Sequence, residues 1–239
     1  MQLQIFRDAD QLAINTANFI IALVKSKPTA TLILTSGDTP VLTYKKIVAL
    51  AQPADFQQVT IIGLDEWVGI SGTNEGSCRY IVEENLLKPL QINLSQYTFF
   101  DSMNSDLSTE CKRVDDLLFS KGGADLILVG VGQNGHIGLN EPHTSFDNYC
   151  HVSQLAEITV TVGQKYFSTN TTLSQGITIG LKHLLEAKCA ILIATGERKA
   201  AIMSEILESE ANEALPATVF KLHKNAYIWL DEAAANGYK

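Results

Sequence analysis

The sequence predicts an α/β protein with a doubly wound, mostly parallel sheet and helices on both faces, in a Rossmann-like fold. Two observations predict it. Apolar runs of strand length recur along the 239 residues, and amphipathic stretches of helical period separate them. Continuous apolar runs are typical of strands buried on both faces, and alternation of strand and helix favours a parallel sheet.

The expected strands are the apolar runs TLILT (31–35), VTIIGL (59–64), DLILVGV (125–131), GITIG (176–180), CAILIAT (189–195) and AYIWL (226–230). The expected helices are the amphipathic stretches at about 9–25, 40–51, 75–87, 106–120, 181–187 and 197–209. No repeat or Pro/Gly-rich linker interrupts this series, so residues 1–239 are expected to form a single domain. Residues 143–175 are polar and weakly periodic, and they are predicted to form a mobile lid.

The composition excludes some classes of partner. A net charge of −8 argues against nucleic acid and anionic membranes, which need a basic face, but not against a small anionic substrate. The four cysteines form no C-x-x-C pair and are expected to be buried, reduced thiols. The N-terminus lacks the pattern of a signal peptide, and no apolar run approaches the ~20 residues of a membrane span. A cytoplasmic protein is therefore expected.

Four segments rich in glycine, polar and charged residues follow predicted strands. They are SGDTP (36–40), DEWVG (65–69), GVGQNGHIGLNEP (130–142) and TGERKA (195–200). In an open parallel sheet, ligands bind in the crevice beyond the carboxyl ends of the strands. If these strands are neighbours, the four segments face one crevice.

The segments at 36–40 and 195–200 are both interpreted as helix starts. Thr39 is predicted as an N-cap with Pro40 as the first helical residue, an arrangement that suits an anion, although a plain capped turn remains the alternative. Asp38 would repel a phosphate by ~1 to ~4 kcal/mol at ~4 Å unless its side chain points away or a cation offsets it. Arg198 or Lys199 is either that cation or part of a solvated helix face.

Asp65 and Glu66 directly follow a predicted strand. Because adjacent strand residues point to opposite faces, only one of the two carboxylates is expected to face the crevice. A carboxylate at the rim of an apolar crevice suits a general base. A solvated strand end is the alternative.

The third segment matches the dinucleotide spacing G-x-G-x-x-G through Gly130, Gly132 and Gly135. A second glycine and Pro142 follow too soon for the long helix that a dinucleotide loop opens, so NAD is disfavoured. The preferred interpretation is that the turn aims His136 at a ligand and that Glu141 fixes its tautomer. Asp65, His136, Glu141 and His143 lack a metal-ligand spacing, so neither a metal nor a cofactor is expected.

These segments together resemble the amino-sugar-phosphate deaminase/isomerase family, whose branches act on glucosamine-6-phosphate and galactosamine-6-phosphate. The resemblance runs from about 31 to 231 and rests on LTSGDTP, LDEWVG, GVGQNGHIGLNEP and ATGERKA in this order. The segments LDEWV, CHVSQL, GITIGLKHLL and LHKN are more similar to the galactosamine branch. The related 6-phosphogluconolactonases share the glycine-histidine turn but lack its Asn-Glu-Pro ending.

The resemblance implies a fold of the sugar-phosphate isomerase type and roles for individual residues. Asp65 would move the C2 proton to C1, and His136, held by Glu141, would open the sugar ring. Asn134 stands where the glucosamine branch often has aspartate, and it can orient but not titrate. The implied substrate and phosphate contacts are Ser36, Gly37, Asp38, Thr39, Gly135, Lys165 and Lys199.

The implied reaction converts galactosamine-6-phosphate to tagatose-6-phosphate and ammonia. The alternatives are glucosamine-6-phosphate deamination to the fructose analogue, hydrolysis of 6-phosphogluconolactone, and an inert sugar-phosphate sensor. The implied partner is a small amino-sugar phosphate, and the sequence leaves a homo-oligomer open.

Overall fold

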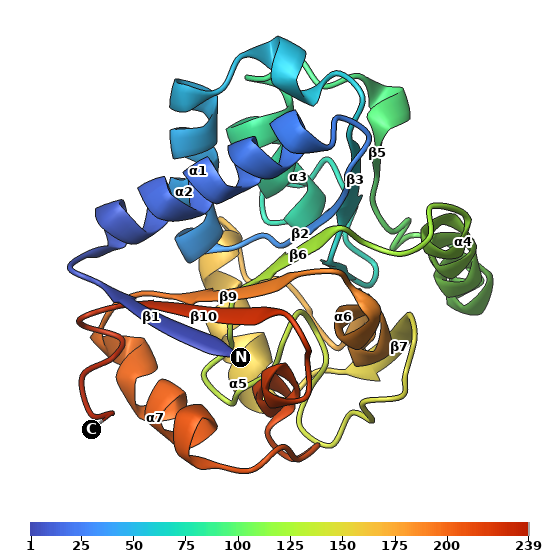
Figure 1. The fold of residues 1–239 in the computed structure, drawn as a ribbon. Helices are drawn as coiled ribbons and strands as arrows, with labels where there is room; N and C mark the ends of the chain where they lie inside the picture. The colour runs from blue at the N-terminus through green and yellow to red at the C-terminus, as the bar shows by residue number, and fades with distance from the viewer. Residues whose placement is uncertain (239) are drawn as a thin grey trace.

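A computed structural model describes residues 1–238 and places a seven-stranded parallel sheet at the centre of the molecule (Figure 1). The strand order is β1-β10-β9-β6-β2-β3-β5, and every neighbouring pair is parallel. The strands are β1 (Gln2–Phe6), β10 (Ala226–Asp231), β9 (Ala190–Ala194), β6 (Leu126–Val129), β2 (Thr31–Leu34), β3 (Thr60–Gly63) and β5 (Tyr97–Thr98).

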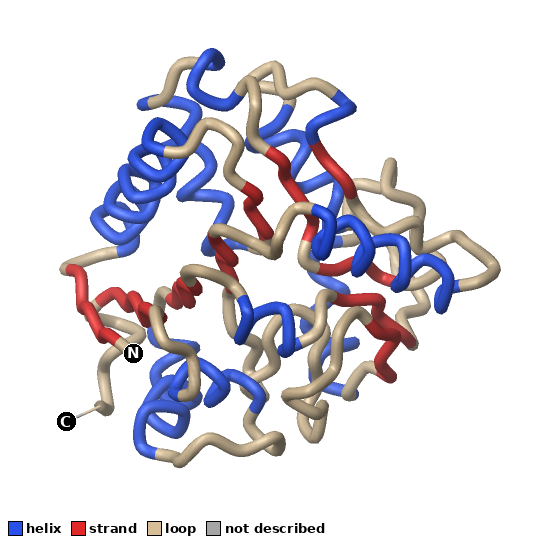
Figure 2. Tube along the Cα trace, turned by 45° about the vertical axis from the view of Figure 1, so that its right-hand side comes forward, coloured by secondary structure: helices blue, strands red, loops and turns tan. Residues whose placement is uncertain are grey.

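Helices cover both faces of this sheet, as Figures 1 and 2 show. They are α1 (Ala9–Ser26), α2 (Asp38–Leu50), α3 (Cys78–Val82), α4 (Leu107–Ser120), α5 (Glu157–Gly163), α6 (Leu181–Glu186) and α7 (Ala200–Glu208). Strand side chains alternate between two cores: Leu32 and Leu34 join the core under α1 and α2, whereas Ile33 joins the core under α4, α6 and α7. The expected doubly wound α/β fold is confirmed.

A second, antiparallel sheet stands beside the first and consists of β4 (Asp65–Trp67), β8 (Gln175–Thr178) and β7 (His151–Gln154). The expectation that 176–180 belongs to a parallel sheet is therefore wrong. The core residues of β8 are as buried as those of the central strands. The hydrophobic pattern of a segment indicates that it is buried, but not which strand it pairs with. Because β4 leaves the central sheet directly after β3, it offers an edge with which β8 pairs.

Other boundaries differ from the expected ones for local reasons. The helix expected at 75–87 begins at Cys78, because the Ser77 side chain accepts a hydrogen bond from the Tyr80 N–H, and it continues as a π-helical turn over Glu83–Leu87. Residues 143–175 are less irregular than expected: they contain β7, α5 and a 3₁₀ turn at Gln164–Tyr166. That this segment moves as a lid stays a prediction.

The strand order sets the position of the site. From β2 the chain adds β3 on one side, and β6 and β9 lie on the other, so the carboxyl ends of β2 and β6 flank a topological switch point. The segments at 36–40 and 130–142 leave these two ends. Among residues 1–238, no helix is long and apolar enough to cross a membrane.

Candidate functional site

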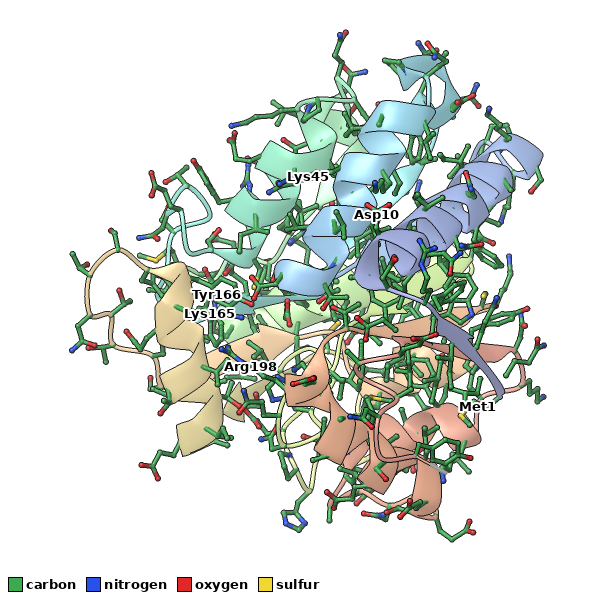
Figure 3. The ribbon with its side chains drawn as sticks, turned by 90° about the vertical axis from the view of Figure 1, so that its left-hand side faces the viewer. Met1, Asp10, Lys45, Lys165, Tyr166 and Arg198 are labelled. Atoms are coloured by element: carbon green, nitrogen blue, oxygen red, sulfur yellow. The ribbon has the colours of Figure 1, made fainter. Side chains whose placement is uncertain are left out.

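A cavity lies beyond the carboxyl ends of β2, β6 and β9, where β4 and α5 close its sides. Most of the predicted site residues line it: Ser36, Gly37, Asp38, Thr39, Asp65, His136, Lys165 and Lys199. Residues from α5 and the following turn complete the wall, and Figure 3 shows Lys165 and Tyr166 next to the first turn of α2. The four strand-end segments therefore meet at one cavity, as expected from the sequence.

Asp65 and Glu66 point to opposite sides of β4, so the expectation that only one faces the cavity is confirmed. Asp65 lines the cavity, although it is 6% exposed, and its Oδ1 has no hydrogen-bond partner among the described residues. Burial raises the pKa of Asp65 to about 6, against smaller lowering by the Cys78 thiol and the His136 charge. A poorly solvated carboxylate with a free oxygen suits proton abstraction near neutral pH.

Glu66 is fully buried and does not line the cavity, and its role is structural. Its carboxylate accepts hydrogen bonds from the backbone N–H groups of Trp67 at 2.9 Å and of Cys78 and Arg79 at 3.0 Å. Two of these donors belong to the first turn of α3, so Glu66 ties that helix to β4. Burial raises the pKa of Glu66 to about 7, although the three hydrogen bonds oppose that shift.

The glycine-rich segment forms a tight turn that presents His136. The Gly132 N–H donates to the His136 carbonyl at 2.9 Å, and a Cβ on Gly132 would stand 2.3–2.5 Å from the imidazole. Glycine is therefore required at 132. Gly135, with φ +78°, faces Leu215 and is not on the cavity wall, so its expected substrate contact is not seen. An isolated bridge between Ile137 and Asn140 follows instead of a helix, which disfavours a dinucleotide loop.

Asn134 and Glu141 lie behind His136 and not on the cavity wall. The Asn134 amide donates to Glu141 Oε2 at 2.8 Å, and the Ala156 N–H donates to Oε1 at 3.2 Å. Burial alone would raise the pKa of Glu141, but the nearby His136 imidazole, with Thr159 and the Asn134 amide, lowers it to about 2. The expected direct bond is longer than a hydrogen bond: His136 Nδ1 is 3.6 Å from Glu141 Oε2.

The anion end of the cavity is the first turn of α2. The prediction that Thr39 caps this helix is wrong, because Gly37 with φ +109° is the N-cap and the helix begins at Asp38. The Thr39 hydroxyl instead lies 3.2 Å from the Thr195 hydroxyl and links two of the strand-end loops. The first backbone N–H groups of a helix have no intrahelical acceptor, so this end can bind an anion.

Two lysines lie at the same end. Lys165 Nζ is 2.5 Å from the Asp38 carboxylate, so a cation offsets this unfavourable anion. Lys199 Nζ donates to the Val131 carbonyl at 2.5 Å. Burial, together with the nearby Lys165 charge, lowers the pKa of Lys199. Arg198, the other candidate cation, is not on the cavity wall.

Several cavity residues escaped the sequence analysis. Two of them, Thr159 and Tyr166, belong to the segment 143–175 that was predicted to be a lid. The Thr159 hydroxyl is 3.2 Å from His136 Nδ1, and the Tyr166 hydroxyl would be 3.4 Å from a Cβ on Gly37. Trp67 and Cys78 also line the cavity. Trp67 lies within the segment 65–69, but no local motif marks Thr159, Tyr166 or Cys78, which reach the site through the packing of α5, of the turn after it and of α3.

The metal ligands considered from the sequence do not form a cluster in residues 1–238. The one candidate group found there, Asp115, Cys150 and His183, lies outside the cavity. His183 Nε2 is 2.7 Å from Asp115 Oδ1, a hydrogen bond that satisfies both side chains without an ion.

Comparison with known proteins gives the same fold and similar sequences. A family model described as Glucosamine-6-phosphate isomerases/6-phosphogluconolactonase matches residues 7–229. A glucosamine-6-phosphate deaminase from Bacillus pumilus is 36% identical over 234 residues, 97% of each chain. A protein named "Putative deaminase AgaI" from Escherichia coli is 37% identical over 219 residues, 90% of this chain and 85% of that protein.

Solved structures agree with these sequence matches. A monomeric glucosamine-6-phosphate deaminase of the NagB superfamily superposes with a TM-score of 0.94 at 31% identity, covering 98% of this chain and 99% of that one. The 6-phosphogluconolactonase of Trypanosoma brucei superposes with a TM-score of 0.81 at 16% identity, covering 100% of this chain and 98% of that one. At that identity the second match supports the fold alone.

Proposed function

Because the chain belongs to the family of glucosamine-6-phosphate isomerases and 6-phosphogluconolactonases, we propose that it is the deaminase that isomerises galactosamine-6-phosphate to tagatose-6-phosphate and releases ammonia. One observation supports an amino-sugar-phosphate substrate. A single cavity has a buried carboxylate and an imidazole at one end, and a helix N-terminus with two lysines at the other. The named deaminase relatives support the same class of enzyme.

The chemistry needs a proton acceptor near C2 and a proton donor or acceptor at the ring oxygen. In the proposed reaction His136 moves the proton that opens the pyranose ring. Asp65 then takes the C2 proton and returns it to C1, which leaves a ketimine that water hydrolyses to the ketose and ammonia. The free Oδ1 of Asp65 suits the second step, because no protein donor competes for its lone pairs.

The phosphate would occupy the opposite end. The first-turn N–H groups of α2 and the Thr39 hydroxyl offer hydrogen-bond donors there, and Lys199 contributes positive charge. This placement supports a substrate whose phosphate is separated from the reacting carbons by the length of a sugar chain. It supports an inert sensor less well, because a sensor needs neither the unpaired Asp65 oxygen nor the held imidazole.

The identity of the sugar is the finer part of the proposal. LDEWV, CHVSQL, GITIGLKHLL and LHKN favour the galactosamine epimer. Relatives named glucosamine-6-phosphate deaminase, at 31–36% identity, favour glucosamine-6-phosphate as the second candidate. The two sugars differ in the direction of the C4 hydroxyl, and a site that hydrogen-bonds this group discriminates strongly between them.

The test compares kcat/KM for galactosamine-6-phosphate, glucosamine-6-phosphate and 6-phosphogluconolactone with the same purified protein. We expect ammonia release from both amino sugars with a preference for the galactosamine epimer. Equal values or a preference for glucosamine-6-phosphate would reject the galactosamine assignment. Activity on the lactone alone would reject deamination altogether.

The ion pair at the phosphate end gives a separate prediction. Asp38→Asn should lower KM for the phosphorylated amino sugar several-fold, because the change removes an anion worth ~1 to ~4 kcal/mol of repulsion at ~4 Å and frees Lys165. Steady-state kinetics at low and high salt measure it, and the gain should shrink as salt screens the charges. Asp147→Asn, which breaks the Lys182 ion pair outside the cavity, is the matched control. An unchanged or raised KM in Asp38→Asn would show that Asp38 does not oppose the phosphate.

A further inference from the structure

We propose that Thr159 is a positioning residue: its hydroxyl accepts a hydrogen bond from His136 Nδ1 and, with the Glu141 carboxylate beside it, fixes the imidazole in the tautomer that leaves Nε2 without a proton. The assignment of His136 to ring opening rests on the proposed function, whereas the tautomer itself does not. Thr159 lies on α5, far in sequence from the glycine-rich turn.

The geometry places Thr159 and Glu141 on the same nitrogen of the imidazole. Thr159 Oγ1 is 3.2 Å from His136 Nδ1, while Glu141 Oε2 is 3.6 Å from the same nitrogen. Thr159 is 4% exposed, so bulk water does not readily replace this contact. The Thr159 hydroxyl is therefore the hydrogen-bond partner of Nδ1, and the carboxylate lies just beyond hydrogen-bond distance.

The charge behind the ring decides the direction of this bond. A threonine hydroxyl can either donate its one hydrogen or accept a hydrogen bond. Glu141, whose pKa is lowered to about 2, is ionised near neutral pH, and its negative charge 3.6 Å from Nδ1 favours a proton on this nitrogen. His136 Nδ1 is then the donor, and Thr159 Oγ1 accepts from it.

The opposite edge of the ring is the part available to the cavity. His136 lines the cavity and its ring lies against Gly132, while Nδ1 is engaged by Thr159 and faces Glu141. Nε2 therefore presents a lone pair to the ligand. A bare Nε2 can take the proton of a sugar hydroxyl and return it to the ring oxygen, which ring opening requires.

Asn134 strengthens this arrangement. Its side-chain amide N–H donates to Glu141 Oε2 at 2.8 Å, and its side-chain oxygen accepts from the backbone N–H of His136 at 3.3 Å. Because the amide is neutral, Glu141 is the only carboxylate that this turn supplies behind the imidazole, within residues 130–142 of the described chain. Because this single charge lies 3.6 Å from Nδ1, the closer contact with Thr159 is expected to matter for holding the ring.

The variants separate the hydroxyl from the shape of the side chain. Thr159→Val removes the hydroxyl and keeps the volume, Thr159→Ser keeps the hydroxyl, and Thr161→Val makes the same change at an exposed position on α5. Losing a neutral hydrogen bond of about 1 kcal/mol corresponds to roughly a fivefold change. We expect kcat to fall about fivefold in Thr159→Val with KM nearly unchanged, and to be retained in Thr159→Ser and Thr161→Val.

The second readout is nitrogen NMR of the histidine rings, with the His136 signals assigned from their loss in His136→Gln. We expect a protonated Nδ1 and a bare Nε2 in the wild type, and a mixture of tautomers in Thr159→Val. A protonated Nε2 in the neutral wild-type ring, or a Thr159→Val variant with wild-type kcat and tautomer, would overturn the proposal. A wild type that shows the expected tautomer but deaminates no amino-sugar phosphate would reject the proposed function and leave this inference standing.

Discussion

Asp65→Asn is expected to lower kcat by about 10²–10⁴-fold, the usual loss when a general base is removed. Asparagine keeps the shape of the side chain but cannot accept the C2 proton. Binding should survive, because the anion-binding groups belong to α2 and to the loop before α7. The affinity for a non-reacting analogue of the substrate should therefore change little while kcat collapses.

Two measurements separate this role from a general disturbance of the site. Exchange of the C2 proton with solvent deuterium should stop in Asp65→Asn, because the variant cannot abstract that proton. In the wild type, kcat/KM should fall as the pH drops below about 6, where burial places the pKa of Asp65 and the base becomes protonated. Exchange at the wild-type rate in the variant would remove Asp65 from the mechanism.

The sequence predicts the central sheet well because its signal is local. Leu32, Ile33 and Leu34 are apolar without a break, and a strand buried on both faces needs such a run wherever it stands in the sheet. The pair at 65 and 66 is equally local, since the two-residue period of a strand separates the carboxylates whichever of them faces the ligand. The site is predictable as far as it follows from strand ends.

The remaining features depend on contacts between distant segments. Thr159 reaches His136 across 23 positions, and Lys165 reaches Asp38 across 127. The placement of β8 follows from an edge that β4 exposes, which no pattern within 175–180 encodes. A single sequence reports which residues are buried, but pairing across such separations is set by how elements pack.

Glu66→Ala is expected to lower the free energy of unfolding by about 2–4 kcal/mol, because it leaves backbone N–H groups unsatisfied in a buried region. Three donors lose their acceptor: those of Trp67, Cys78 and Arg79. Since two of them begin α3, the helix that carries Cys78 to the cavity should fray as well. Urea denaturation followed by circular dichroism measures the loss.

Asp65→Asn changes the adjacent carboxylate and is the matched control. It should raise the free energy of unfolding rather than lower it. Burial raises the pKa of Asp65 from 3.8 to about 6, so the folded state binds the proton more tightly than the unfolded state does. Ionised Asp65 therefore destabilises the fold, by an amount that grows from about pH 4 to about pH 6 and is constant above. Asp65→Asn should gain on the order of 1–3 kcal/mol at pH 7 and nothing near pH 4.

If Glu66→Ala is as stable as the wild type, the Glu66 carboxylate is not what holds α3 against β4. If Asp65→Asn loses stability at pH 7, the unpaired carboxylate is not the strained group that its burial implies.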